Sequence, residues 1–326
     1  MIMSGAARAK ALNPSANPSA NPSANSAANP AGPALLGAYL AAGLAILIWS
    51  GTPAATRLAV LDMDPLAAAI MRTVLAAAVA VPLLVILQVF NPGRARPVGR
   101  GQWGVLALTA ATGFIGFTVL FSLGTQLTSA AHAALINASI PLFAGLFGVL
   151  AERRAPRPAW FIGMGLSFIG VMALIAVRGP DASGASLLGD LLCLASSVVA
   201  AIGYVSGSRL AKSIGTVSVT FWAVSLAALV QAPLVYLLWD AADWAAIGVE
   251  GWGALAYLAL GPSLVAYVAW YWGLAHGGVV RIAPLQFFMP VVSLALAVSI
   301  FREALTAPLL ASATAIVAGI VIARKR

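Results

Sequence analysis

The sequence predicts an all-α membrane protein with ten transmembrane helices, arranged as two inverted five-helix repeats. Three observations lead to this fold class. Hydrophobic residues make up 61% of the 326 residues and charged residues only 8%, whereas soluble domains carry about 25% charged residues. Apolar segments of roughly 20 residues recur along the chain. The charges between these segments alternate in sign from one connector to the next.

Each expected span is long enough to cross a lipid bilayer. An α-helix rises about 1.5 Å per residue, so about 20 apolar residues cover a hydrocarbon core of about 30 Å. Proline and glycine inside the spans suit helices that pack against other helices in a bilayer. We expect the ten spans at residues 35–58, 65–90, 103–123, 128–150, 158–178, 187–209, 216–239, 252–274, 279–301 and 305–323.

The connectors indicate how the chain is oriented. Lys and Arg resist translocation, so basic connectors stay in the cytoplasm. One set of alternate connectors holds 14 of the 18 basic residues: Arg8, Lys10, Arg94, Arg96, Arg100, Arg153, Arg154, Arg157, Arg209, Lys212, Arg281, Arg324, Lys325 and Arg326. The other set holds 8 of the 9 acids: Asp62, Asp64, Asp181, Asp190, Asp240, Asp243, Glu250 and Glu303. We therefore expect a multi-pass protein of the bacterial plasma (inner) membrane, with an even number of spans and both termini cytoplasmic.

The two halves of the chain resemble each other. Spans four and nine each contain a proline, Pro141 or Pro290, followed by an apolar run and an acid beside an arginine, Glu152 or Glu303. Because each half has five spans, an odd number, the second half enters the membrane from the opposite side. We expect an arm at 1–34, a first five-helix repeat at 35–180 and a second at 181–326. The arm repeats Asn-Pro-Ser-Ala, has little to bury, and is expected to be disordered.

Several function classes are excluded by composition and motifs. The net charge of +9 is spread over one membrane face, without the interleaved aromatic residues of a nucleic-acid patch, so no nucleic-acid partner is expected. Cys193 is the single cysteine and is expected to be a small core residue. No metal-ligand spacing, HExxH or GxSxG motif occurs, so neither a cofactor nor an enzymatic activity is expected.

Five short motifs occur in order along the spans. They are Trp49-Ser50-Gly51, Pro65 to Arg72, Pro141/Glu152, Gly189-Asp190 and Pro290/Glu303. In this order, over residues 35–324, they resemble the EamA-type permeases of the drug/metabolite transporter superfamily, with most similarity to the YddG-type amino-acid exporters. The resemblance implies solute transport, commonly export of amino acids or other metabolites.

Arg72 is the first candidate site residue. It lies eight residues past Asp64, so about 12 Å from the end of its span. A charge at that depth needs a polar cavity or a partner. Two interpretations stay open: Arg72 contacts a substrate carboxylate, or it pairs with backbone carbonyls or an acid such as Asp190.

Three further polar residues are candidates for substrate contact. His132 lies in the outer third of span four and could bond a substrate, titrate near neutral pH, or simply bond a neighbouring carbonyl. Asn137 and Gln286 lie close to the prolines of spans four and nine. A proline frees backbone carbonyls that an amide can satisfy, so these amides either join helices or line a pore.

Aromatic residues inside the spans are the remaining candidates. Tyr267 and Tyr271 are four residues apart and share one helix face. Aromatic walls with a few polar groups suit small, partly apolar solutes. We expect Trp49, Phe114, Tyr204, Tyr267 and Tyr271 to surround a central cavity together with Arg72, His132, Asn137 and Gln286.

The sequence thus predicts a monomeric transporter of small molecules that is embedded in the lipid bilayer. The expected activity is export of aromatic or other apolar amino acids by alternating access. Alternatives are transport of other drugs or metabolites, and a channel-like facilitator. No acid lies at the middle of a predicted span, so passive or weakly coupled flux is compatible with the sequence.

Overall fold

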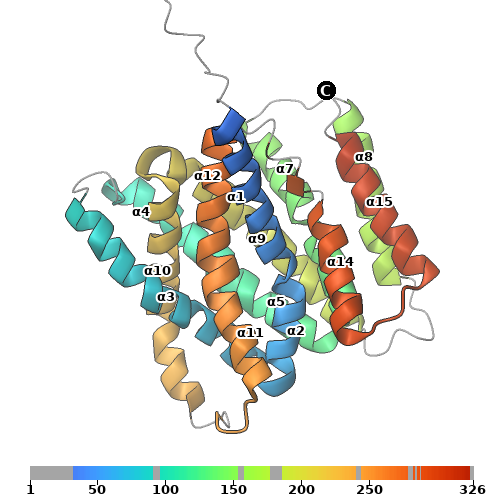
Figure 1. Ribbon diagram of the computed structural model, residues 1–326, viewed down its shortest axis with the longest axis horizontal. Helices are drawn as coiled ribbons and strands as arrows, with labels where there is room; N and C mark the ends of the chain where they lie inside the picture. Colours follow the sequence, from blue (N-terminus) through green and yellow to red (C-terminus); the bar gives the residue numbers. More distant parts are fainter. Residues whose placement is uncertain are drawn as a thin grey trace, which may run out of the picture.

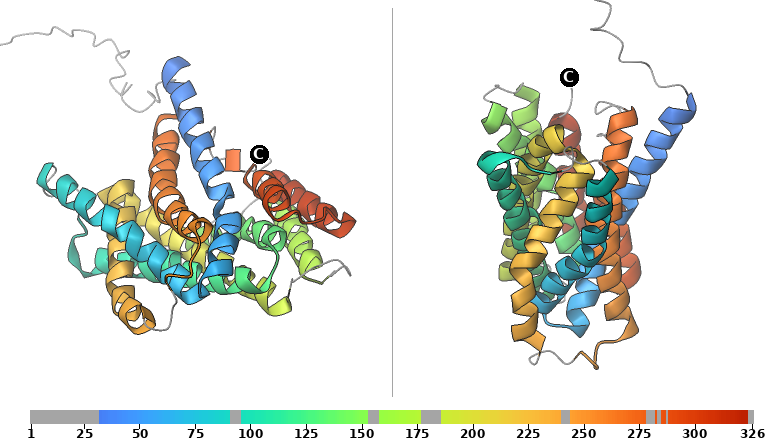
Figure 2. Two further views of the ribbon diagram at one scale, coloured as in Figure 1. Left: turned by 60° about the horizontal axis from the view of Figure 1, so that its bottom comes forward. Right: turned by 90° about the vertical axis from the view of Figure 1, so that its left-hand side faces the viewer.

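The structure of the protein is a computed structural model that describes residues 32–90, 96–152, 158–176, 186–239, 244–277, 282, 285–286 and 288–323. Every regular element in these residues is helical. The helices run side by side between two ends of one bundle, and α1 begins at the same end at which α15 finishes (Figures 1 and 2). Of the predicted arm at 1–34, only residues 32–34 are described. Eleven of the predicted connector charges, between Arg94 and Arg326, also lie outside the described residues.

The helices occur in this order: α1 (Gly32–Ser50), α2 (Thr52–Asp62), α3 (Pro65–Phe90), α4 (Gly99–Thr109), η1 (Ala110–Gly116), α5 (Phe117–Leu127), α6 (Ala130–Asn137), α7 (Ile140–Glu152), α8 (Pro158–Ala176), α9 (Leu187–Ile214), α10 (Thr216–Trp239), α11 (Val249–Leu260), η2 (Gly261–Val265), α12 (Ala266–Gly277), α14 (Phe288–Phe301) and α15 (Ala307–Ala323). η1 and η2 are π-helical.

Eight helical stretches of the described residues are long and apolar enough to cross a membrane. Two shorter apolar helices, α14 and α15, cover parts of the ninth and tenth predicted spans. Helix α3 and helix α10 coincide with predicted spans 65–90 and 216–239. The multi-pass, all-helical class is therefore confirmed, while the count of ten spans is not, because much of the stretch before α14 lies outside the described residues.

Four of the apolar stretches are not continuous α-helices. The first breaks between α1 and α2 at Gly51, and the fourth between α6 and α7 at Ala138 and Ser139. The third and eighth contain η1 and η2. A π-helix displaces backbone bonds, and side chains then satisfy the freed carbonyls: Phe114 O accepts from Thr118 Oγ1 at 2.7 Å and Thr73 Oγ1 at 3.3 Å. The predicted span boundaries did not anticipate these interruptions.

Each of the main helix pairs combines a helix from the first part of the chain (α1 to α8) with one from the second part (α9 to α15). Helix α1 packs on α12, α3 on α10, α5 on α9, α8 on α15, and α6 on α14. Glycines make some of these contacts close. A Cβ on Gly203 of α9 would lie 2.7 Å from Gly113 Cα of η1, and one on Gly170 would lie 3.0 Å from the Ser312 carbonyl oxygen of α15. The absence of a side chain at Gly203 thus lets η1 and α9 pack closely, and Cys193 is a buried core residue as expected.

Candidate functional site: a cavity between the two parts of the chain

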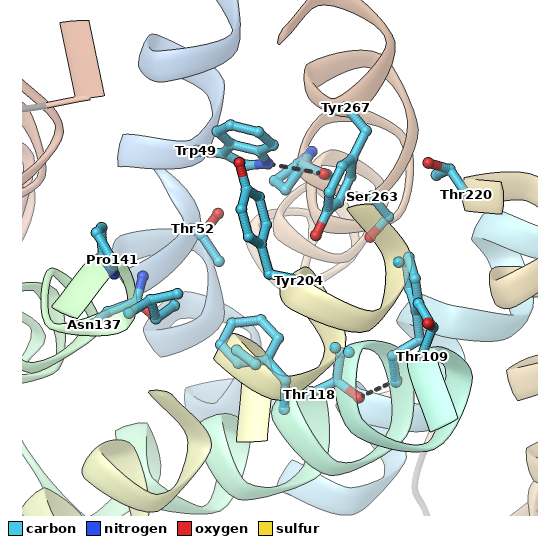
Figure 3. A pocket seen from close by; sticks show the side chains of 18 of the residues that line it. Trp49, Thr52, Thr109, Thr118, Asn137, Pro141, Tyr204, Thr220, Ser263 and Tyr267 are labelled. Carbon is cyan, nitrogen blue, oxygen red and sulfur yellow. Dashed lines mark hydrogen bonds between the residues drawn. The ribbon is translucent and has the colours of Figure 1, made fainter. Parts of the chain in front are cut away.

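A cavity of about 160 Å³ lies inside the bundle, lined by residues from both parts of the chain. Its walls combine the interrupted stretches described above, including η1, η2 and the α6–α7 break, with the continuous helices α3, α9 and α10. Figure 3 shows part of this lining. The interruptions shape the cavity, because each turns backbone and side chains away from the regular helix positions. Eighteen of its lining residues are drawn in Figure 3.

The cavity extends toward one end of the bundle. On α9, its lining residues run from Ala200 to Ala211, a length of about 16 Å along the helix. Thr216 and Thr220 of α10 continue the lining beyond the C-terminal end of α9. Of the described α9 residues, none before Ala200 lines the cavity. The lining on α9 therefore does not reach the opposite end of the bundle, where α9 begins.

Aromatic rings form one wall of the cavity. The Trp49 ring meets the Tyr267 ring edge to face at 5.2 Å between centroids, and Phe114 lies 6.1 Å from Tyr267. Trp49 Nε1 donates a 3.1 Å hydrogen bond to Pro262 O in η2. The Tyr204 ring projects into the space between Asn137 and Tyr267, with its hydroxyl near Trp49 (Figure 3). Such rings bury large apolar area and prefer these edge-on contacts.

Arg72 is the charged side chain among the described residues that line the cavity. It is only 6% exposed. Its Nε donates to Ser263 Oγ at 3.3 Å, and its guanidinium carbon lies 5.9 Å from the Phe117 ring centroid. Instead of pairing with Asp190, Arg72 therefore has a hydroxyl and an aromatic face as neighbours. Within the described residues, the guanidinium makes no other hydrogen bond, so several of its five N–H donors remain for a ligand.

Asn137 stands at the end of α6, where the fourth stretch breaks, and is 3% exposed. Its carbonyl oxygen has no hydrogen-bond partner among the described residues. Gln286, on the corresponding segment of the second part, also lines the cavity. A buried acceptor without a donor costs free energy, so the Asn137 oxygen is available to accept a hydrogen bond from a ligand.

His132 and Asp190 lie outside the cavity lining and contact each other. His132 Nδ1 is 3.1 Å from Asp190 Oδ2 and 3.2 Å from Asp190 Oδ1. Asp190 is fully buried and also accepts a hydrogen bond from Thr128 Oγ1 at 2.5 Å. A buried carboxylate needs such partners, which explains why the structure places His132 beside Asp190 rather than beside the cavity.

Most of the residues predicted for the site come together in the cavity lining: Trp49, Arg72, Phe114, Asn137, Tyr204, Tyr267 and Gln286. The side chain of Tyr271, on α12, is not among the described ones. Sequence reasoning missed the lining hydroxyls of Thr52, Thr109, Thr118, Thr220 and Ser263. A Ser or Thr inside an apolar span was the available signal, but helix packing uses such residues equally often. Among the described residues, no three His, Cys, Asp or Glu side chains gather as metal ligands.

Comparison with known proteins adds to this geometry. The model of the EamA-like transporter family matches the chain twice, at residues 36–176 and 187–324. The chain is similar to the uncharacterized transporter YdeK of Bacillus subtilis, with 34% identity over 282 residues, which are 86% of this chain and 95% of that protein.

Two further similarities are more distant. The aromatic amino acid exporter YddG of Ancylobacter novellus is 28% identical over 207 residues, which are 62% of this chain and 70% of that protein. A solved crystal structure with 25% sequence identity superposes with a TM-score of 0.62, covering 89% of this chain and 98% of the other.

Proposed function

The chain belongs to the EamA-like transporter family, and from that premise we propose that it exports amino acids with aromatic or other apolar side chains. The transporter class follows from the family. The choice of amino acids is supported by the cavity, and above all by Arg72. The distant similarity to an aromatic amino acid exporter points in the same direction.

Arg72 is the observation that carries this proposal. A guanidinium buried in an apolar bundle is costly unless an anion or a set of hydrogen-bond acceptors faces it. The cavity lining supplies Ser263 and the Phe117 ring but, among the described residues, no carboxylate. A substrate carboxylate supplies the missing charge and accepts two parallel N–H bonds from the guanidinium.

The rest of the cavity suits an apolar side chain attached to that carboxylate. The rings of Trp49, Phe114, Tyr204 and Tyr267 offer apolar faces. Hydroxyl and amide groups are few by comparison, which is typical of sites for small, partly apolar ligands. A volume of about 160 Å³ limits the ligand to a small metabolite.

We further propose ten spans, arranged as two inverted five-helix repeats, with both termini cytoplasmic in the bacterial inner membrane. The helix contacts have the symmetry that two repeats would give. If each helix is replaced by its counterpart in the other half, the α1–α12 pair becomes the α9–α5 pair, and the other main pairs stay the same. The start of α1 and the end of α15 lie at one end of the bundle (Figure 1). A cavity at the interface of two such repeats is where transporters of this architecture bind substrate.

Alternating access of one monomer is the mechanism that this arrangement supports. On α9, the cavity lining extends toward the end where the helix finishes and does not reach the end where it begins. Rocking of one repeat against the other would make the cavity extend toward the opposite end of the bundle instead. Arg209 and Lys212 lie at the end toward which the cavity extends, which supports a cytoplasm-facing state under the proposed topology.

Counterflow in liposomes tests the proposal. Purified protein is reconstituted with unlabelled aromatic amino acid inside, and uptake of labelled tryptophan, phenylalanine, leucine and alanine is followed. We expect uptake that is stimulated by internal substrate, greatest for tryptophan and phenylalanine, and weak for the corresponding amino-acid amides, which lack the carboxylate. Liposomes containing the Arg72→Met variant serve as the control for leak.

The outcomes separate the alternatives. Uptake without stimulation by internal substrate indicates a channel-like facilitator. Good uptake of the amides contradicts the role of Arg72. No uptake of any amino acid contradicts the proposed substrate class and directs the same assay to other metabolites.

A further inference from the structure

We infer that polar contacts at the N-terminal end of α6 form a gate that must open for substrate to pass. These contacts join residues 127–132 of the first half to Ser186, Asp190 and Glu303 of the second half, and we call them the α6 latch. The inference rests on the proposed alternating-access carrier, and it assigns to these residues a part in the transport cycle.

Glu303 makes the first contact of the α6 latch. It lies in the connector between α14 and α15, at the end of the bundle opposite to the C-terminus (Figure 1). Its two carboxylate oxygens accept hydrogen bonds from the backbone N–H groups of Ala130, at 2.7 Å, and Ala131, at 2.9 Å. The first N–H groups of a helix lack intrahelical partners and carry partial positive charge. An acid from one half therefore caps a helix of the other half.

Asp190 makes the second contact. It lies in the first turn of α9 and accepts from Thr128 Oγ1, at 2.5 Å, while His132 Nδ1 lies 3.1 Å from its Oδ2. Ser186, just before α9, also donates its backbone N–H to Leu127 O at 2.9 Å. The turn between α5 and α6 is thus bound to the start of α9 by both side chains and backbone.

The position of the α6 latch relative to the cavity suggests its role. Asp190 precedes the first α9 residue of the cavity lining, Ala200, by ten residues, which is about 15 Å along a helix. The latch therefore lies between the cavity lining and the end of the bundle at which α9 begins. Because the latch contacts join the two halves, they must separate for a path to open there.

The connector between α14 and α15 also contains a residue in an unfavourable backbone conformation. Arg302, next to Glu303, has φ +53° in the left-handed region. This conformation is unfavourable for a side chain with a Cβ and persists where surrounding contacts enforce it. Glu303, whose carboxylate accepts from the first N–H groups of α6, follows Arg302 directly.

Cysteine accessibility tests the gate. Cys193 is the single cysteine, and its replacement by Ala gives a background in which Thr118→Cys reports on the cavity lining. A separate Ala304→Cys protein, at an exposed position of the α14–α15 connector, shows in intact cells or inverted vesicles from which side the latch end is reached. An impermeant maleimide is then applied to the Thr118→Cys protein from each side.

We expect slow labelling of Thr118→Cys from the latch side in the otherwise unchanged protein. Glu303→Gln removes a charged helix cap, and Thr128→Val removes a charge-assisted hydrogen bond to Asp190. Each loss should raise this labelling rate about fivefold. Labelling from the opposite side should fall in the same variants, because the population shifts between two states. Glu250→Gln removes an exposed acid from the first turn of α11 and should change neither rate.

Two results would overturn the inference. Unchanged latch-side labelling in Glu303→Gln, Glu303→Ala and Thr128→Val, each folded by size-exclusion chromatography, would make the contacts purely structural. A rise in labelling from both sides would indicate general loosening rather than a gate. The assay needs no substrate, so failure of the proposed amino-acid transport leaves its outcome readable.

Discussion

The cavity and the α6 latch both hold charged side chains inside the helix bundle, but they differ in how those charges are partnered. At the latch, Asp190 and Glu303 receive donors from Thr128, Ala130 and Ala131, with His132 beside Asp190. In the cavity, Arg72 has one hydrogen bond among the described residues, and the Asn137 oxygen has none.

This difference distinguishes a site that binds a ligand from contacts that hold the protein's own helices together. Buried polar groups in native proteins are nearly always satisfied. Where the protein satisfies them, as at the latch, the groups hold helices together. Where it leaves a cation and an amide oxygen without full partners beside a cavity, an external molecule is expected to complete them.

Removal of the Asp190 carboxylate should have the largest effect, on stability. Asp190→Ala leaves His132 and Thr128 without their acceptor in a fully buried position, and breaking such a buried network costs about 3 kcal/mol. We expect a clear fall in the melting temperature of the detergent-solubilised protein. Cys193→Ala, one turn further along α9 and equally buried, is the matched control and should lower it much less.

A double-mutant comparison sharpens that result. Asp190→Ala combined with His132→Ala should cost less than the sum of the two single changes, because the residues are in contact. Asp190→Ala combined with Arg72→Met should be additive, since Arg72 bonds Ser263 instead. Coupling between Arg72 and Asp190 would contradict the separation of the two regions.

Neutralising Arg72 should have the next largest effect, on transport. Arg72→Met removes the proposed carboxylate partner and should lower the initial rate of amino-acid counterflow about 100-fold, as loss of a charge-assisted bidentate pair implies. Arg72→Lys keeps the charge without the planar fork and should retain intermediate activity. Arg209→Gln, an exposed arginine on α9, should transport normally. Equal rates for Arg72→Met and the unchanged protein would refute the proposal.

A smaller effect is expected for the aromatic wall. Tyr267→Ala removes the ring that contacts both Trp49 and Phe114. Counterflow of tryptophan and phenylalanine should fall about tenfold, and that of alanine less, because only the larger side chains lose ring contacts. The rates are normalised to folded protein. An equal fall for all substrates would indicate a packing role for Tyr267.

The smallest effect concerns Asn137. Because its oxygen lacks a donor in the substrate-free protein, Asn137→Ala should leave the melting temperature unchanged or raise it, while weakening substrate binding about fivefold, which corresponds to about 1 kcal/mol. Thermal shift with and without substrate measures both. A large fall in melting temperature without substrate would show that Asn137 bonds the protein.

The general architecture could be predicted from the sequence because the bilayer constrains it strongly. Long apolar stretches must be helices when no water satisfies the backbone, and α3 and α10 have the predicted bounds. Candidate residues such as Arg72 and Tyr204 were recognisable because charged and hydroxyl-bearing side chains are rare inside spans.

The interruptions and the partners could not be predicted in the same way. The Phe114 carbonyl of η1 accepts a hydrogen bond from Thr73 of α3 as well as from Thr118, and the contact with α3 requires the tertiary structure. His132 and Asp190 are 58 positions apart, and either could have contacted other groups. Pairing between distant residues decides which polar side chains remain for a ligand, and one sequence does not contain that information.

The central claim is that the cavity binds a substrate through its carboxylate on Arg72. The most direct measurement compares the dissociation constants of phenylalanine and its amide, by calorimetry, for the unchanged protein and the Arg72→Met variant. We expect the unchanged protein to bind the acid at least about tenfold more tightly than the amide, and this ratio to fall to about one in Arg72→Met. Equal ratios in the two proteins would contradict it.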